Sequence, residues 1–275
     1  MAYRGIEVDP LIPAIGAEIQ GVDLSRPLDD QTYGEIHEAW MKHLVIFFRD
    51  QDLTLDQHKA FGRWFGALHI HPAAPGPEGH PEIFVVHTDK DSTFSEGNGW
   101  HSDVSCDAEP PMGSILRLHT LPATGGDTLF CNTYLVYDNL SASMKTHLEG
   151  LTAIHEGEQI FRGRYAEEGV DDSGKNYPRA EHPLIRTHPV TGRKCVYVNQ
   201  AFTTGIKELR YTEARSVLDY LFEQIERPKY QCRFRWRKHS IAMWDNRCAQ
   251  HYAMWDYRPH TRSGFRVTVK GDKPQ

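Results

Sequence analysis

The feature that most constrains this chain is a histidine and an aspartate two residues apart, with another histidine far downstream. His101 and Asp103 form the pair, and His251 is the distant residue. In an extended strand alternate side chains project from one face, so His101 and Asp103 could bind the same metal ion. Two imidazoles and one carboxylate on one face of an ion leave its other face open, which is typical of non-haem Fe(II) sites that activate oxygen. A closed zinc site would more usually contain cysteine.

Spacing alone is weak evidence, because the chain has 16 histidines and chance matches are common. His87 and Asp89 have the same spacing, but they follow the apolar run at 82–86 and fit a strand end with a solvated turn equally well. Neighbouring motifs favour the first pair. These motifs are Gly99-Trp100 directly before it, Gly125-Gly126-Asp127-Thr128 after it, and Trp244-Asp245-Asn246-Arg247 shortly before His251.

Two other histidines could supply the third ligand, and we rank both below His251. His239 follows a run of alternating basic and aromatic residues and fits a surface position. His260 lies in the turn at 259–261, only two residues before Arg262. His251 alone is preceded by the motif at 244–247, so it is the predicted third ligand.

Composition and cysteine usage predict the general class of protein. The 275 residues are 39% hydrophobic and 11% aromatic, enough for one sizeable core, so we expect a single domain over 1–275. The first residues lack the apolar run of a secretory signal, and no segment approaches the length of a membrane span. We therefore expect a cytoplasmic protein without membrane contact. The five cysteines are scattered without a C-x-x-C pair, which favours free thiols over disulfides or a cysteine zinc site.

The charge argues against nucleic acid as a partner. The formal net charge is −6, whereas binding to phosphates requires a positive surface that displaces counterions. One segment could suggest otherwise, since Arg233, Arg235 and Arg237 alternate with Phe234 and Trp236. Strict alternation is typical of a half-buried strand, with the aromatic side chains inward and the guanidinium groups in water. We therefore expect no nucleic-acid partner.

Hydrophobic periodicity predicts mostly strands with a few peripheral helices. Thr54 and Gln57 form a capping-box pattern, which predicts a helix to about Phe65 that stops at Gly66. Two more helices are expected through 36–40 and over 214–225, the second ending before Pro228. Strands are predicted at 44–48, 82–88, 114–120, 128–132, 194–198, 231–237, 240–244 and 264–270. Many short strands suit a double-sheet jelly roll of the cupin type, in which an early strand could supply two ligands and a late strand the third.

With these motifs in place, the chain resembles the taurine dioxygenase and 2,4-dichlorophenoxyacetate dioxygenase family of Fe(II)- and 2-oxoglutarate-dependent oxygenases. The further landmarks of the resemblance are Ile15-Gly16-Ala17-Glu18-Ile19, His69-Ile70-His71-Pro72, Arg186-Thr187-His188-Pro189, Val198-Asn199 and Gly271-Asp272-Lys273-Pro274. It implies a double-stranded β-helix that uses Fe(II), with 2-oxoglutarate and O2 as co-substrates. Relatives that halogenate lack a carboxylate at the position of Asp103, so its presence favours hydroxylation. The resemblance also implies a homo-oligomer, either a dimer or a tetramer.

Arg262 and Arg266 are predicted to bind two different anions. Four positions apart on a strand, they share a face but lie about 13 Å apart, too far to hold one small anion jointly. Arginine binds carboxylates and sulfonates with two hydrogen bonds and stays charged. The resemblance implies that Arg262 binds the distal carboxylate of 2-oxoglutarate with help from Thr128, and that Arg266 faces the acidic group of the primary substrate. Either arginine standing alone would fit a surface ion pair.

The expected substrate is a small organic acid, and the resemblance is less specific here. His71, Phe161 and Phe202 match residues that line the substrate pocket of taurine dioxygenases. Ala74 and Gly97 replace a tyrosine and an asparagine of those enzymes, although Asn98 could substitute for the amide. Both replacements remove a hydrogen-bonding side chain together with its volume, so the pocket would admit a larger or less polar substrate.

We rank hydroxylation of a taurine-like sulfonate first, with release of sulfite and an aldehyde. The alternatives are the same reaction on a phenoxyalkanoate, an alkyl sulfate or another small acid. A non-catalytic sensor of metal and 2-oxoglutarate has less support, since it would not require a second anion-binding arginine. A hydrolytic zinc enzyme has less still, because no His-Glu-x-x-His motif is present. The polar segment at about 157–182 is interpreted as a mobile loop that could close over the substrate, with an ordinary surface loop as the alternative.

Overall fold

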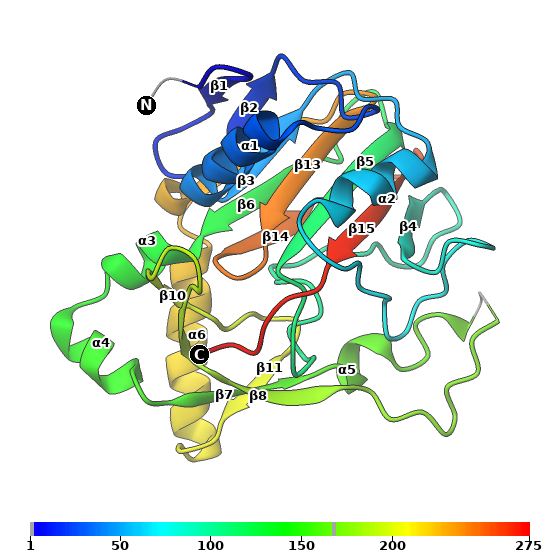
Figure 1. Ribbon diagram of the computed structural model, residues 1–275. Coiled ribbons are helices and arrows are strands. Elements are labelled where there is room, and N and C mark those ends of the chain that lie inside the picture. Colours follow the sequence, from blue (N-terminus) through cyan, green and yellow to red (C-terminus); the bar gives the residue numbers. More distant parts are fainter. Residues whose placement is uncertain (1–2, 167–168) are drawn as a thin grey trace.

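The computed structural model describes residues 3–166 and 169–275. Its largest element is a seven-stranded sheet with the strand order β1-β2-β3-β13-β5-β15-β4 (Figure 1). These strands are β1 Glu7–Pro10, β2 Ala17–Gln20, β3 Val45–Phe48, β4 Ile83–Thr88, β5 Gly113–Thr120, β13 Ser240–Asp245 and β15 Arg262–Val269. Neighbours pair antiparallel except β2 and β3, which are parallel. Strands from both ends of the chain therefore meet in one sheet.

A second sheet contains β12 (Gln231–Phe234), β6 (Thr128–Asn132) and β14 (Ala249–Ala253), in that order. Aromatic side chains join its inner face to the large sheet. Phe47 of β3 stacks on Phe234 of β12 with ring centroids 3.8 Å apart, and Phe130 of β6 packs edge-on against Phe47 at 5.6 Å. Burial of these rings removes a large apolar area from water and holds the two sheets face to face. The predicted double-sheet jelly roll of mainly β structure is confirmed.

Helices cover the outer face of the large sheet. In Figure 1, α1 (Asp30–His43) and α2 (Leu55–Arg63) lie over it. Thr54 and Gln57 form the predicted capping box, since each side chain accepts a hydrogen bond from the other residue's backbone N–H. The helix ends at Arg63, slightly before the predicted end. Trp40 of α1 and Phe61 of α2 are buried in the core between this helical layer and the sheet.

The remaining elements form a third region around α6 (Tyr211–Ile225), whose apolar residues Leu218 and Leu221 are buried. This helix confirms the one predicted over 214–225. The other elements here are α3 Thr133–Asp138, α4 Ala142–Leu148, α5 Glu158–Phe161, the 3-10 helix Pro228–Tyr230, and the strands β7 Thr152–Glu156, β8 Arg179–Pro183, β9 Ile185–Thr187, β10 Lys194–Val196 and β11 Thr203–Ile206. The segment predicted as a loop over 157–182 contains α5 and the start of β8, and its residues 167–168 lie outside the described part.

The predicted strands are present, with shifted ends. Over 231–237 the pairing stops at Phe234, but burial goes on alternating, with Phe234 and Trp236 buried and the three arginines exposed. The third ligand is expected on a late strand, and β14 carries His251, but the range of β14 is absent from the predicted strands. Its sequence Ala249-Gln250-His251-Tyr252-Ala253 has no β-branched residue and no clear alternation, so periodicity could not identify it. Within residues 3–166 and 169–275, no helix has the length and apolar character needed to cross a membrane.

Candidate active site

A cavity of about 290 Å³ lies between the two sheets, with walls from β4, β5, β13 and β15 on one side and β6 and β14 on the other. The loop before His101 and residues of α5 complete it. Every residue predicted for metal, co-substrate or substrate borders this cavity: His71, Asn98, His101, Asp103, Thr128, Phe161, Phe202, His251, Arg262 and Arg266. The chain thus brings together groups that are far apart in the sequence.

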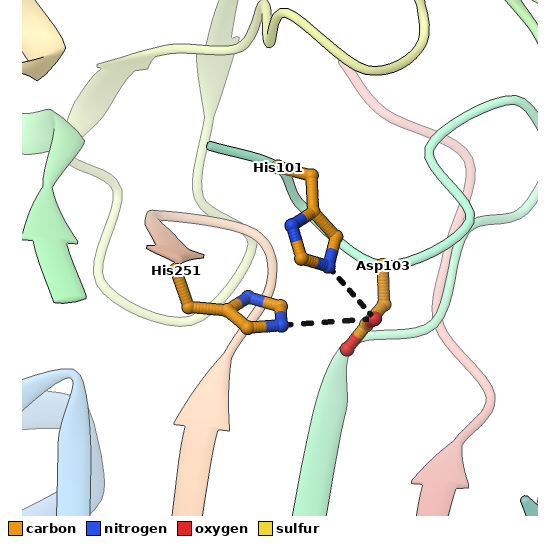
Figure 2. A group of neighbouring side chains, drawn as sticks. All are labelled: His101, Asp103 and His251. Carbon is orange, nitrogen blue, oxygen red and sulfur yellow. Dashed lines mark ion pairs between the residues drawn. The ribbon is translucent and has the colours of Figure 1, made fainter. Parts of the chain in front are cut away.

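The three predicted metal ligands converge at one wall of the cavity. His101 Nε2 lies 3.7 Å from Asp103 Oδ1, and His251 Nε2 lies 3.9 Å from the same oxygen. One atom of each residue lies within 4.8 Å of the others. Figure 2 shows both imidazole rings turned toward the carboxylate. Two nitrogens and one oxygen at these separations can face a single ion from one side.

The local backbone differs from the prediction that both early ligands lie on a strand. His101 makes an isolated bridge to His251, with His251 N–H donating to His101 O at 2.9 Å and His101 N–H donating to His251 O at 3.1 Å. Asp103 follows in a turn, where Val104 has a positive φ of 46°. The turn brings the carboxylate back toward the histidines, so a turn replaces strand alternation as the reason that the two side chains meet. His251 does lie on a strand, β14.

The donor groups fit a metal ion of the Fe(II) type. The Nδ1–H of His101 donates to the Gly99 carbonyl at 2.9 Å, which leaves the lone pair of Nε2 directed toward the other ligands. Burial and the neighbouring His101 lower the pKa of His251 well below its usual value, so this ring is a neutral imidazole, the form that binds metals. Two imidazoles and a carboxylate also match the facial donor set of mononuclear iron sites.

Asp103 is held by residues whose roles the sequence did not reveal. Ser114 Oγ donates to Asp103 Oδ2 at 2.6 Å, and Asn246 Nδ2 donates to Ser114 Oγ at 2.9 Å. The Asp103 backbone N–H donates to Asn246 Oδ1 at 3.2 Å. Asn246 belongs to the motif at 244–247, which signalled importance without a function, whereas nothing in the sequence singled out Ser114. Together they fix the orientation of the carboxylate.

Arg266 makes a contact that the sequence did not predict. Its Nη1 donates to Asp103 Oδ1 at 2.6 Å, and its Nε has no hydrogen-bond partner among the described residues. Burial by itself would raise the pKa of Asp103, but the positive charge of Arg266 and the hydrogen bond from Ser114 oppose it, and the pKa lies well below its usual value. The carboxylate is therefore ionised, and Arg266 retains hydrogen-bonding capacity for a further anion.

Arg262 is a buried cation without a carboxylate partner in the described part of the chain. Only 2% of the residue is exposed. Its Nε donates to the Gly126 carbonyl at 3.1 Å, and its Nη2 donates to Thr128 Oγ1 at 3.4 Å. Burial lowers the pKa of Arg262 to about 10, so the group stays charged at neutral pH. A buried charge is costly unless it is paired, which indicates that an anion completes this site.

His71 presents a hydrogen-bond donor to the cavity. Its Nδ1 accepts from the backbone N–H of Ala74 at 2.8 Å and of Ala73 at 3.2 Å, so the proton of the neutral ring is on Nε2. Burial and the nearby Arg266 lower the pKa of His71 to about 3. The ring packs against Phe161 with centroids 5.2 Å apart. Ala74 is not part of the cavity wall and acts here through its backbone.

Gly97 has a backbone conformation that favours glycine and lies next to a proposed metal ligand. It has a positive φ of 76°, and a Cβ added there would lie 3.0 Å from His101 Cε1. A side chain at this position would therefore be strained and would press on the imidazole. The neighbouring Asn98 is exposed at the border of the cavity, so it is not placed as a buried amide.

The competing histidines lie away from this centre. His87 and Asp89 have largely solvated side chains, 50% and 37% exposed, and neither borders the cavity. His239 Nδ1 pairs with Asp52 at 3.1 Å, and His260 is exposed in a turn. The same spacing thus gives a solvated pair in one place and a buried pair of potential ligands in the other.

A second group of potential ligands, His188, Asp245 and Cys248, is explained by its own hydrogen bonds. His188 Nε2–H donates to Asp245 Oδ2 at 3.0 Å, while Nδ1 accepts from the Thr191 backbone N–H at 3.1 Å. Arg247 donates to both oxygens of Asp245 at 2.7 and 2.8 Å. Both ring nitrogens are therefore in use, and the network anchors the end of β13 next to Asn246.

A jelly roll that places two imidazoles, a carboxylate and a buried unpaired arginine around one cavity defines a mononuclear metal-dependent oxygenase. Comparison with known proteins identifies the family. The sequence matches "Taurine catabolism dioxygenase TauD, TfdA family" over residues 7–268, and the chain belongs to that family. The protein is therefore a 2-oxoglutarate-dependent dioxygenase, which uses Fe(II), 2-oxoglutarate and O2.

Individual relatives agree along nearly the whole chain. An "Alpha-ketoglutarate-dependent sulfonate dioxygenase" of Saccharomyces cerevisiae is 33% identical over 98% of this chain and 68% of its own length. An "Alpha-ketoglutarate-dependent sulfate ester dioxygenase" of Pseudomonas putida is 32% identical over 98% of this chain and 91% of its own. The crystal structure of a taurine dioxygenase from Burkholderia xenovorans superposes with a TM-score of 0.85 at 36% identity, covering 98% and 91% of the two chains.

Proposed function

We propose that this enzyme hydroxylates the carbon next to the sulfur atom of a small taurine-like sulfonate. The observation that carries the proposal is Arg266, a second arginine that lines the cavity beside the proposed metal ligands although Arg262 already supplies a separate anion site. The relatives named above, which act on a sulfonate and on a sulfate ester, support an acid of sulfur as substrate.

In this proposal His101, Asp103 and His251 hold Fe(II), and Arg262 with Thr128 binds the distal carboxylate of 2-oxoglutarate. When bound, Fe(II) together with 2-oxoglutarate supplies the activation of O2. One oxygen atom goes into succinate as 2-oxoglutarate loses carbon dioxide, and the other is inserted into the substrate C–H bond. The resulting hydroxysulfonate then breaks its C–S bond. The electron pair of that bond leaves with sulfite, and the hydroxyl proton is lost as the carbonyl of an aldehyde forms.

The chain's own residues bind and orient the substrate. The guanidinium of Arg266 and the Nε2–H of His71, which both line the cavity, are the proposed donors for the sulfonate oxygens. Phe161 and Phe202 provide an apolar wall for the carbon body and exclude water from it. Asn98, at the border, can bind a polar group at the far end. Correct placement of the target C–H bond is the main contribution of these residues to the rate.

The test is an anaerobic titration followed by turnover. Fe(II) and 2-oxoglutarate are added first, and acids are then screened for a change in the resulting charge-transfer absorption. On admission of O2, an accepted sulfonate should give succinate and sulfite in equal amounts. If sulfonates leave succinate at the uncoupled background while another class of acid raises it, the sulfonate assignment is wrong.

A second candidate is the same reaction on an alkyl sulfate or a phenoxyalkanoate. Gly97 favours it, because it borders the cavity and contributes no side-chain hydrogen bond or bulk to it. Such substrates would release sulfate or a phenol in place of sulfite, so the product distinguishes them. Oxygen consumption that depends on a substrate would in turn argue against a binding-only sensor.

We also propose that residues 1–275 act as one catalytic unit within a cytoplasmic homo-oligomer. All five cysteines are free and buried, which supports a reducing compartment. Light scattering coupled to size-exclusion chromatography would give the mass. A mass of 31.5 kDa, that of one chain, would contradict the oligomer.

A further inference from the structure

A second ion pair borders the same cavity, and neither residue has a role in the proposed function. Glu96 lies on the loop before His101, and Arg164 follows α5. Arg164 Nε donates to Glu96 Oε1 at 3.2 Å, and the side chains are 27% and 23% exposed, respectively. The two residues are 68 positions apart in the sequence, so only the fold reveals the pair.

The pair is held in place by further contacts. Arg164 Nη2 also donates to the Ser95 carbonyl at 3.5 Å, and the guanidinium lies 3.7 Å from the centre of the Phe94 ring. Next to it, burial and the charge of Glu96 raise the pKa of Tyr165, so this phenol stays neutral. The carboxylate of Glu96 is thus already paired with Arg164, and contacts with Ser95 and Phe94 hold that guanidinium in place.

The charged residues around the cavity carry a net charge of +1, which one negative charge would balance. Among the described residues that line it, the arginines are Arg164, Arg262 and Arg266, and the carboxylates are Glu96 and Asp103. Three cations against two anions leave one positive charge. Fe(II) brings two positive charges and 2-oxoglutarate two negative ones, which cancel. A substrate with a single negative charge therefore balances the charges of the cavity, whereas a zwitterion does not.

We infer that Glu96 and Arg164 are specificity-determining residues that select organic monoanions and reject substrates carrying an ammonium group. The inference rests on the proposed function and narrows it to a sulfonate with an uncharged tail. A substrate ammonium in this cavity would meet Arg164 and would find no free carboxylate, because Asp103 is a proposed metal ligand and Glu96 is paired. An unpaired charge removed from water is strongly disfavoured. An alkyl tail instead packs against Ile160, Phe161 and Phe202.

Taurine and propane-1-sulfonate test this selectivity, because they have nearly the same size and differ in an ammonium and a methyl group. Affinity for each is measured anaerobically from the absorption of the Fe(II) and 2-oxoglutarate complex. We expect the wild type to bind propane-1-sulfonate at least about tenfold more tightly, a difference of about 1.4 kcal/mol. Sulfite release on admission of O2 should follow the same order.

Substitutions test the separate contributions of Arg164 and Glu96 to this selectivity. Arg164→Met removes the cation but keeps the length of the side chain, which leaves Glu96 free to pair with an ammonium. The ratio of the two affinities should then shift toward taurine by about tenfold or more. Adding Glu96→Gln in the same chain should remove most of that gain. Arg179→Met is the matched control, because Arg179 pairs with Glu156 at 2.9 Å but does not border the cavity. It should leave the ratio unchanged.

The inference is overturned if the wild type binds taurine as tightly as propane-1-sulfonate, or if Arg164→Met leaves the ratio as it was. Failure of the proposed function gives a different result. Neither sulfonate would then change the absorption of any variant, while an acid of another class would. The selectivity would then be tested with that acid. Binding of its amino-substituted form and of its alkyl form would be compared in the same variants.

Discussion

The two ends of the cavity are built in different ways. At the metal end, backbone and buried side chains hold the proposed ligands. His101 and His251 are bridged through their backbones, and Asp103 is fixed by Ser114 and Asn246. At the substrate end, the wall comes from segments joined by partly exposed side chains, such as Arg164 and Glu96. The difference indicates that the chemistry is built into the jelly roll, while the choice of substrate depends on surface segments that can change without disturbing it.

The largest expected effect comes from removing a metal ligand. His101→Ala or Asp103→Ala should abolish the charge-transfer absorption of the Fe(II) and 2-oxoglutarate complex and lower the turnover rate by about 1,000-fold or more, because two donors hold the ion poorly. His87→Ala and Asp89→Ala are the controls, since that solvated pair has the same spacing. Equal losses in both pairs would contradict the location of the metal end.

Asp245→Asn should be the most destabilising change, because it leaves the buried Arg247 without its partner. Both side chains are almost fully buried, 1% and 4% exposed, so we expect a loss of about 3–5 kcal/mol in the free energy of unfolding. Urea titration followed by circular dichroism measures it. Asp138→Asn, which breaks an exposed pair with Arg193, should have no measurable effect.

The stability lost in Asp245→Asn should depend on pH. Burial opposes ionisation of Asp245, but the charge and hydrogen bonds of Arg247 and the hydrogen bond from His188 outweigh it and lower the pKa in the folded state. Its contribution is therefore complete above the ordinary aspartate pKa of about 3.9 and is lost as the pH falls below that value. Asp245→Asn should lose stability mainly at neutral pH and less in acid. An equal loss at every pH would contradict this assignment.

Arg262→Met should weaken 2-oxoglutarate binding about 100-fold, which corresponds to about 3 kcal/mol, because a charged two-point contact is lost. The unliganded variant should be as stable as the wild type or more so, since a buried unpaired cation is replaced by an apolar group of similar length. Thr128→Val removes only one hydroxyl and should cost about tenfold or less. If Arg262→Met bound 2-oxoglutarate as tightly as the wild type, the co-substrate would have to bind at another site.

Sequence reasoning reached the metal end more completely than the substrate end. His101 and Asp103 directly follow a motif, His251 lies shortly after another, and Arg262 is eleven residues further on, so their meeting in one cavity could be predicted without coordinates. The turn at Asp103 could not, because a pattern of residue types does not distinguish a strand from a tight turn over so short a stretch.

Contacts between distant side chains were also out of reach. The pairing of Arg266 with Asp103 joins residues 163 positions apart, and the pairing of Arg164 with Glu96 depends on how a surface segment lies against a loop. No periodicity in a single sequence encodes either contact. From the sequence, Gly97 indicates only the loss of an amide, whereas the structure shows a positive φ that favours glycine and a His101 ring close by.

The two variants with the smallest expected effects test most directly whether the metal end and the substrate end of the cavity are independent. Ser114→Ala removes one hydrogen bond from Asp103 and should weaken Fe(II) binding about tenfold, as expected for a group that orients a metal ligand. Phe202→Ala enlarges the apolar wall and should raise the KM for the substrate about tenfold, while Fe(II) and 2-oxoglutarate bind as in the wild type. Titrations of all three ligands in both variants measure this. If Phe202→Ala weakened Fe(II) binding as much as Ser114→Ala, the two ends would be one cooperative unit, and the substrate wall could not vary independently of the metal site.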